Sequence, residues 1–247
     1  MLMNNRESLI QVNNLSKKFN GFVAVDSISF ETKAGEIFGL LGPNGAGKTT
    51  TLRITSSILQ PTSGSVEVCG CDVVKDSQKV RENIGILTTE IGVYDRFTGR
   101  ENLAYFGELY GLGREQLDDR IEVLSKLLDM QEFLDRKAGT YSTGMKQKLA
   151  IARSIIHDPQ VVILDEPTTG LDVLASLTVV DFMRMEKKAG KSVILSTHRM
   201  SDAEKLCDRV AIMHKGKLID LDTVKGLLRK TKTVDLEEAF LKMINNK

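Results

Sequence analysis

Residues 42–49 read GPNGAGKT, and their spacing is suited to binding phosphate. Gly42, Gly47, Lys48 and Thr49 fit the pattern GxxxxGK[ST], with an apolar strand-like run before it and a helical run after it, as this motif requires. The glycines let successive backbone N–H groups curl around a phosphate, and the lysine ammonium reaches the β- and γ-phosphates. The threonine hydroxyl can hold Mg²⁺. The predicted nucleotide-binding residues of this loop are Gly42, Pro43, Asn44, Gly45, Ala46, Gly47, Lys48, Thr49 and Thr50.

Two other apolar runs end in residues that nucleotide hydrolysis uses. VVILDE places Asp165 and Glu166 after a strand-like run, where a parallel α/β sheet presents its binding groups. Asp165 can complete the Mg²⁺ environment, and Glu166 can act as general base toward a water in line with the γ-phosphate. SVILSTH places His198 just beyond another strand, as a candidate γ-phosphate contact. Taken alone, the Asp-Glu pair could be a surface pair before a turn, and His198 could be an incidental histidine. Together with the phosphate loop, these residues predict a site that hydrolyses a nucleotide.

Strand-like and helical patterns alternate in a way that would bring these residues together. Short β-rich runs fill the first seventy residues, helical spacing covers about Gly99 to Ile156, and apolar strand-like runs then return. This alternation indicates a parallel sheet covered on both faces. We expect an α/β fold with a P-loop (RecA-like) parallel-sheet core. Residues 1–87 and 159–222 would form this core with an N-terminal antiparallel β subdomain, residues 88–158 an inserted helical subdomain, and residues 223–247 a helical tail.

The helical stretches have apolar residues that fall on one face. These residues are Leu103, Phe106, Leu109 and Tyr110 in the insert, and Val234, Leu236, Phe240, Leu241 and Ile244 in the tail. Helical spacing of this kind predicts a helical insert and an amphipathic helix in the tail.

Composition excludes several classes of protein. The 247 residues carry 34 Lys+Arg and 33 Asp+Glu, so a net charge of +1 gives no global field that favours nucleic acid. Three cysteines form no even disulfide set, which favours a reducing compartment. We expect no signal peptide and no membrane-spanning helix, because no apolar run reaches about 18 residues. A membrane function would therefore need another chain to cross the bilayer.

The turn Tyr141-Ser142-Thr143-Gly144-Met145, about twenty residues before the Asp-Glu pair, resembles the signature sequence of ATP-binding cassette (ABC) proteins. The motif order along nearly the whole chain is similar as well: phosphate loop, signature turn, LDEP, TGLD and STH. In detail, VYDRFTGRENL, YSTGMKQK and LEEAF resemble the sodium-exporter ATPase and related drug-export ATPases. The chain is thus identified as resembling the ATP-binding subunit of an ABC exporter.

The resemblance implies that ATP lies between two subunits arranged head to tail, each phosphate loop facing the signature turn of the other. Ser142 and Gly144, at a helix start, would form the second anion cradle. Asp172 would couple the two sites, and Phe19 would stack on adenine, unless it is simply a core phenylalanine. The partners implied are a second copy of the chain and a transmembrane permease on a separate chain, at the cytoplasmic face of the cell membrane. The cofactors implied are ATP and Mg²⁺.

The chain departs from the family pattern at two positions. Met145 replaces the glutamine of the usual signature turn, as in the exporter subgroup. Thr89 stands where the family has a glutamine that touches Mg²⁺ and the attacking water. A threonine hydroxyl can still contact metal or water with a shorter reach, and Glu90 is an alternative substitute.

These observations favour an ATP-hydrolysing motor subunit of a transporter. An ABC-type switch with little turnover, regulating a membrane partner, is the alternative that the Thr89 replacement supports. A translation or DNA-repair protein is disfavoured because the chain has one cassette and no sustained heptads. A small-molecule kinase would share the phosphate loop but not the signature turn.

Overall fold

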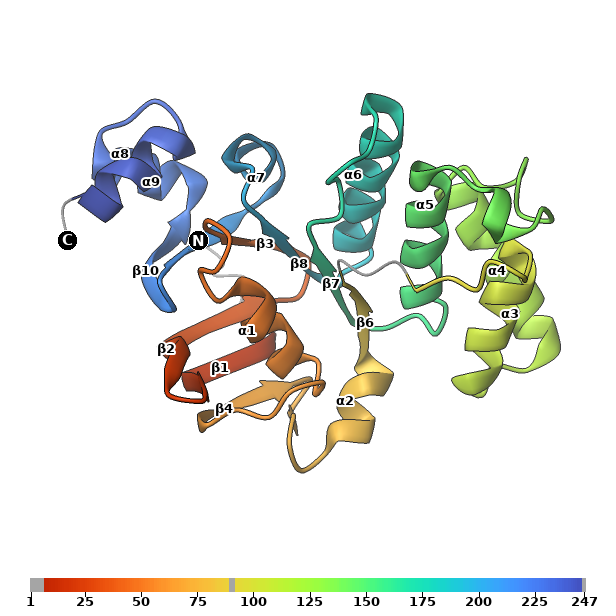
Figure 1. The fold of residues 1–247 in the computed structure, drawn as a ribbon, viewed down its shortest axis with the longest axis horizontal. Coiled ribbons are helices and arrows are strands. Elements are labelled where there is room, and N and C mark those ends of the chain that lie inside the picture. Colours follow the sequence, from red (N-terminus) through yellow and green to blue (C-terminus); the bar gives the residue numbers. More distant parts are fainter. Residues whose placement is uncertain (1–6, 89–91, 246–247) are drawn as a thin grey trace.

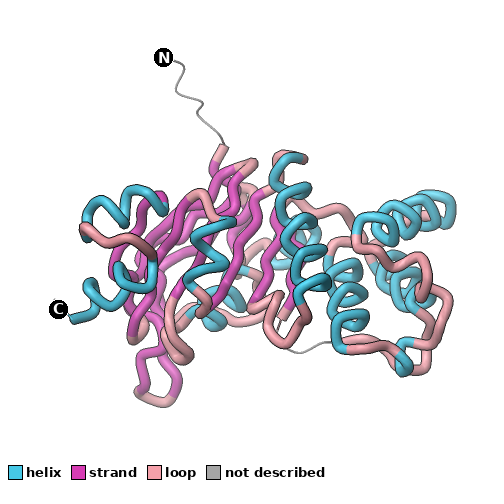
Figure 2. The backbone as a smooth tube through the Cα atoms, turned by 90° about the horizontal axis from the view of Figure 1, so that it is seen from above, coloured by secondary structure: helices cyan, strands magenta, loops and turns pink. Residues whose placement is uncertain are grey.

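The computed structural model describes residues 7–88 and 92–245, whose strands form two sheets (Figures 1 and 2). The first is antiparallel and has the order β2-β1-β4-β5. Its strands are β1 (Ser8–Phe19), β2 (Phe22–Lys33), β4 (Ser63–Val68) and β5 (Cys71–Asp72). It is the antiparallel β subdomain that the N-terminal sequence predicts.

The second sheet has the order β10-β9-β3-β8-β7-β6 and is parallel except for β10, which pairs antiparallel with β9. Its strands are β3 (Glu36–Leu41), β6 (Ile84–Leu87), β7 (Val161–Asp165), β8 (Ser192–Thr197), β9 (Arg209–His214) and β10 (Lys217–Thr223). Every residue of β3, β7 and β8 is buried. Their continuous apolar runs are typical of parallel strands covered on both faces, so the predicted core is confirmed.

One face of the parallel sheet packs against the antiparallel sheet and helix α1 (Lys48–Thr55). Phe38, Ile163 and Ile194 of the parallel sheet share a buried cluster with Leu52 and Ile54 of α1. Helix α2 (Ser77–Asn83) joins this cluster through Val80, and strands β1, β2 and β4 close it. Helix α1 is thereby held between the two sheets, with the phosphate loop at its start.

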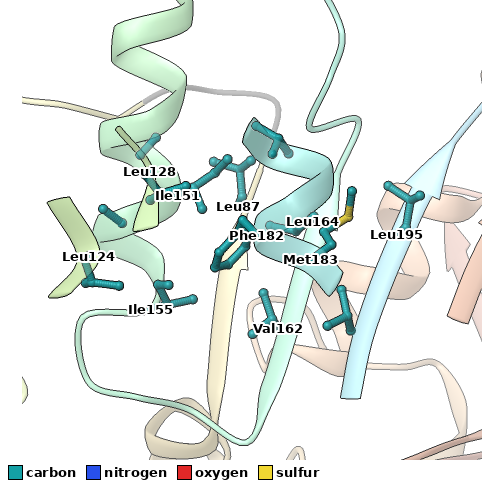
Figure 3. Packing of buried hydrophobic residues seen from close by; sticks show 14 of the residues in the cluster. Leu87, Leu124, Leu128, Ile151, Ile155, Val162, Leu164, Phe182, Met183 and Leu195 are labelled. Carbon is teal, nitrogen blue, oxygen red and sulfur yellow. The ribbon is translucent and has the colours of Figure 1, made fainter. Parts of the chain in front are cut away.

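The opposite face is covered by α5 (Thr143–Ser154), α6 (Val173–Lys188) and α7 (Met200–Leu206). Strand residues alternate between the two faces, so Val162, Leu164 and Leu195 point to this side and not to α1. Figure 3 shows them meeting Phe182 of α6 and Ile155 of α5. This packing places the start of α5 and the start of α6 beside each other.

The middle of the chain is helical, as predicted, and lies at one end of the molecule without strands (Figure 2). It contains α3 (Gly99–Leu109), α4 (Arg114–Leu127) and a short 3₁₀ helix, η1 (Ala138–Thr140). A capping box between Thr98 and Glu101 begins α3. Leu103 is fully buried but Leu109 is 65% exposed, so this apolar face is not covered along its whole length. Leu109 is the last residue of α3, beyond the part that α4 and α5 cover.

The C-terminal tail forms α8 (Val224–Thr231) and α9 (Leu236–Asn245), next to α7 (Figure 1). Leu236 is buried and Phe240 is half-buried, but Val234 is 79% exposed and Leu241 is 49% exposed. The tail is helical, as predicted, and these two residues stay exposed because Val234 precedes α9 and α9 lies at the edge of the molecule (Figure 1). In the described part of the chain, no helix combines the length and apolarity that crossing a membrane requires.

Candidate active site

The phosphate loop connects β3 to α1 in a conformation that glycine makes possible. Gly47 has φ +102°, and a Cβ there would lie 2.6 Å from the carbonyl oxygen of Ala24. Gly47 is also the N-cap of α1 and provides no side-chain cap, so the first N–H groups of the helix stay available to a ligand. The loop therefore offers backbone donors and a helix N-terminus in one place.

Lys48 lies inside this loop and not in solvent. Its Nζ donates to the carbonyl oxygens of Gly42 (2.7 Å) and Pro43 (3.3 Å), and its side chain is 6% exposed. Burial lowers the pKa of the ammonium, while the nearby carboxylates of Glu166 and Asp165 oppose that shift. Two carbonyl oxygens of the phosphate loop thus hold the Lys48 ammonium inside that loop.

Thr49 and Asp165 are 116 residues apart in sequence but meet at the carboxyl end of the sheet. The Thr49 hydroxyl donates to Oδ2 of Asp165 over 2.8 Å. The other oxygen, Oδ1, is buried and has no hydrogen-bond partner among the described residues. A buried carboxylate oxygen without a partner next to a threonine hydroxyl is a donor set that fits Mg²⁺. Thr89, the third predicted metal contact, lies outside the described residues.

Glu166 follows Asp165 with a left-handed backbone, φ 53°, which is uncommon for a residue other than glycine. Its N–H donates to the Ser196 carbonyl of β8 over 2.9 Å, which holds that conformation. One carboxylate oxygen, Oε1, lies 2.9 Å from His198 Nδ1 and 3.9 Å from Lys48 Nζ, and Oε2 accepts from Thr169 over 3.2 Å. Strained backbone of this kind clusters at functional sites.

A cavity of about 340 Å³ opens over these groups. Its walls are made by the phosphate loop, by Asp165 and Glu166, and by the hairpin that joins β1 to β2. The predicted residues lining it are Phe19, Asn44, Gly45, Ala46, Gly47, Lys48, Thr49, Thr50, Asp165 and Glu166. His198 touches Glu166 but lines a neighbouring cavity with Pro43 and Asn44.

The signature turn is built at the start of another helix. Ser142 is the N-cap of α5, and its Oγ accepts from the Met145 N–H over 3.2 Å. Asp172 caps α6 in the same way, with Oδ1 accepting from the Ala175 N–H over 2.8 Å. A Cβ on Gly144 would lie 3.3 Å from the Ala175 Cβ, so glycine lets the two helix starts approach.

Ser142, Gly144 and Asp172 line a second cavity, of about 690 Å³. Among residues 7–88 and 92–245, no residue lines both this cavity and the one over the phosphate loop. The chain therefore brings the predicted residues together as two groups, not one.

The chain matches a known protein family. The family model described as "ABC transporter" matches residues 25–169, more than half of the chain. The chain belongs to the ABC transporter family.

Among relatives of this ABC transporter chain, the ABC transporter ATP-binding protein NatA of Bacillus subtilis is 43% identical over 219 residues, covering 88% of this chain and 89% of NatA. The Nod factor export ATP-binding protein I of Burkholderia lata is 35% identical, covering 94% of this chain and 76% of that protein. A solved structure described as the ATP binding subunit of an ABC transporter superposes with a TM-score of 0.89 at 27% identity, covering 96% of this chain and 99% of that one. The chain is accordingly an ATP-binding, ATP-hydrolysing subunit of an ABC transporter.

Three further residues of this ABC subunit contact the predicted site or its helices and are not among the predicted site residues. Phe22 lines the nucleotide cavity opposite Phe19, across the turn Asn20-Gly21, in which both residues have positive φ. The sequence FNGF contains a signal for this, because Asn-Gly between apolar residues predicts a two-residue hairpin that pairs its flanks.

Gln147 of α5 donates to the Pro167 carbonyl over 2.9 Å and ties the signature helix to the loop after Glu166. No motif signals that contact.

Arg153 is the third residue, at the last turn of α5. Its guanidinium donates to the Gly92 carbonyl and lies 4.8 Å from the centroid of the Phe106 ring. Burial lowers the pKa of this group. It links the signature helix to the segment that follows β6.

Proposed function

We propose that two copies of this chain close head to tail around two ATP molecules and thereby drive a separate transmembrane subunit. The separation of the two anion-binding turns supports this most directly, because the phosphate loop and Ser142–Gly144 line different cavities of one chain. Each turn lies at a helix N-terminus, which suits phosphate. A second copy would bring its signature turn to the phosphate loop of the first and complete the site.

In this proposal Glu166 is the general base. Its carboxylate takes a proton from a water molecule as the water oxygen bonds to the γ-phosphorus and the bond from that phosphorus to the β–γ bridging oxygen breaks. The products are ADP and inorganic phosphate. His198, 2.9 Å from the same carboxylate, orients Glu166 and contacts the γ-phosphate, while Lys48 balances the charge of the β- and γ-phosphates.

Thr49 and Asp165 would hold Mg²⁺, directly or through its water molecules. The buried and unpartnered Oδ1 of Asp165, beside the Thr49 hydroxyl, supports this assignment. Bound there, the ion would neutralise charge on the phosphates.

Phe19 and Phe22 would stack on the adenine, since both line the cavity and are 42% and 67% exposed.

The permease would dock where residues 88–158, the proposed helical signature subdomain, begin. Tyr94, Phe97 and Tyr105 are 47%, 39% and 41% exposed and contact one another edge-on or tilted, which leaves an aromatic surface on α3 and the segment before it. Exposed aromatic residues of this kind mark protein interfaces. This surface would face the transmembrane subunit at the cytoplasmic side of the membrane. Export is the proposed direction, because one relative is named for Nod factor export.

Steady-state release of phosphate by the purified chain tests the proposal. Glu166→Gln keeps the size and hydrogen-bonding capacity of the side chain but loses the base, so kcat should fall about 100-fold or more. In sedimentation velocity, this variant should be a monomer without nucleotide and a dimer with ATP. Ser142→Arg in the same background is the matched control and should stay monomeric. An unchanged kcat in Glu166→Gln, or a Glu166→Gln variant that stays monomeric with ATP, would contradict the proposed motor function.

A low-turnover switch is the second candidate, favoured by the threonine at position 89. It shares the dimer but predicts a wild-type kcat close to that of Glu166→Gln. The hydrogen-bonded pair of Glu166 and His198 favours turnover, because a switch has no need of an oriented base.

A further inference from the structure

The C-terminal helix α9 packs on the short helix that follows His198. The N–H of Leu236, the first residue of α9, donates to Oε2 of Glu204 on α7 over 3.1 Å. Leu236 and Ala239 are fully buried, and Leu236 belongs to the same buried cluster as Ala203 and Leu206 of α7. Figure 1 shows α9 beside α7 and α8, at the far end of the molecule from the helical insert. A hydrogen bond to a carboxylate and the buried side chain of Leu236 thus join the tail to α7.

Helix α7 depends on such packing to keep its position. It has seven residues, and its N-cap, Arg199, makes no side-chain cap hydrogen bond. Helices this short are not stable by themselves in water, so tertiary contacts must hold them. Ala203 and Leu206 are the buried residues of α7, and Glu204 lies between them in the sequence.

The position of His198 depends in turn on α7. The side chain of His198 is 45% exposed, and its hydrogen bond to Glu166 depends on where its backbone is held. Its backbone lies between β8, which ends at Thr197, and α7, which begins at Met200. Because the β8 side is fixed in the sheet, a shift of α7 is the simplest way to displace His198 from Glu166.

Helix α9 also contacts the support of the phosphate loop. Phe240 lies edge-on to His214, with 6.3 Å between ring centroids, at the end of β9. In the following turn, the Gly216 N–H donates to the Ala46 carbonyl over 3.1 Å. The tail therefore contacts the strand whose following turn is hydrogen-bonded to the phosphate loop.

A cavity of about 540 Å³ separates α9 from those loops. Pro43 and Asn44 form one wall, residues 198–201 another, and Glu237, Phe240 and Leu241 of α9 the third. Helix α9 thus forms an outer wall beside His198 without lining the nucleotide cavity itself.

We propose that α9 is a positioning element for His198, and that Glu204 is the residue through which it acts. The inference rests on the role of His198 in the proposed function. By fixing α7, the tail sets the rate of the hydrolysis step while leaving ATP binding unchanged. A partner protein that moved α9 would change turnover without contact with the nucleotide.

Glu204→Ala tests this in the full chain, because it removes the acceptor for Leu236. We expect kcat to fall about fivefold with KM for ATP within twofold of wild type, since the change acts on orientation and not on binding. Glu204→Gln should restore most of kcat, because its amide oxygen can accept the same N–H. Lys205→Ala, on the exposed side of the same helix, is the matched control and should equal wild type.

A chain ending at Thr233 gives a second measurement. It should show the same loss of kcat, and adding Glu204→Ala to it should cause no further loss, because Glu204 then has no α9 to hold. If the shortened chain does not fold, as judged by circular dichroism, the full-length Glu204 pair decides alone. Unchanged kcat in Glu204→Ala, or an equal loss in Glu204→Gln, would overturn the inference. Glu166→Gln measured alongside shows separately whether the proposed hydrolysis mechanism holds.

Discussion

His198 Nδ1 lies 2.9 Å from Oε1 of Glu166, and the two residues come from the ends of neighbouring strands, β8 and β7. The same carboxylate oxygen lies 3.9 Å from the Lys48 ammonium, which begins α1. Side chains from the start of α1 and from the end of β8 therefore meet the same oxygen atom of the carboxylate that follows β7. Parallel strands make this possible, because their carboxyl ends meet at one edge of the sheet.

His198→Ala should lower kcat by about 10- to 100-fold, because Glu166 loses the partner that orients it. Affinity for ATP should change little, since Lys48 and the backbone donors of the loop remain. The measurement is phosphate release at saturating ATP, with binding followed by a fluorescent ATP analogue. In the double variant with Glu166→Gln, the two losses should not add, because the residues act as a unit. Additive losses would mean that they act independently.

Phe19→Ala and Phe22→Ala should each weaken the binding of ADP about fivefold, which corresponds to about 1 kcal/mol of lost stacking on the base. Isothermal titration calorimetry would measure both affinities. Inorganic tripolyphosphate is the control ligand, because it has no base to stack and its affinity should stay at the wild-type value. If tripolyphosphate weakened equally, the two rings would be supporting the phosphate loop and not the base.

The sequence predicts the strands of the core and the polar residues at their ends, for a physical reason. Strands that are buried on both faces need continuous apolar sequences, so polar functional residues can occur only where such a sequence ends. Lys48, Asp165 and His198 can therefore be recognised as polar residues at or beyond the ends of apolar strand sequences. Their convergence follows from the topology of a parallel sheet, and the 2.8 Å contact of Thr49 with Asp165 agrees with it.

Contacts between elements that pack side by side are not predictable in this way. Gln147 reaches the Pro167 carbonyl, and α9 reaches α7, through the angle and register of helix packing, which no local spacing encodes. Periodicity also does not say how far a neighbour covers an apolar face. Leu109 and Leu241 fit the helical pattern and are nevertheless exposed, because each lies where its helix passes beyond the core.

Acid should destabilise the fold through His157. Burial lowers the pKa of this histidine to about 4, and its Nδ1 is buried without a partner among the described residues. As the pH falls, His157 is therefore protonated near pH 6.5 in the unfolded chain but only near pH 4 in the folded chain. This contribution to stability is complete above about pH 6.5 and is lost as the pH falls toward 4, by at most about 1.4 kcal/mol per pH unit.

Urea unfolding at pH 7.5 and pH 5.0 measures this effect. His157→Phe keeps a ring that can stack on Tyr110, as the histidine does at 3.7 Å between centroids, but it cannot take up a proton. The free energy of unfolding should fall less between the two pH values in this variant than in wild type. Equal decreases would place the acid sensitivity elsewhere.

Thr89 stands where the family pattern has a glutamine. Thr89→Gln should raise kcat, because the longer amide side chain can reach Mg²⁺ and the attacking water more easily than a hydroxyl. A fivefold rise would correspond to about 1 kcal/mol of barrier. Thr89→Val is the matched control: it keeps the shape of threonine but has no hydroxyl, so kcat should fall if that hydroxyl contributes. Phosphate release at saturating ATP measures both. A rise in the first variant and a fall in the second would mean that the native threonine works but limits turnover, whereas two unchanged rates would remove position 89 from the reaction.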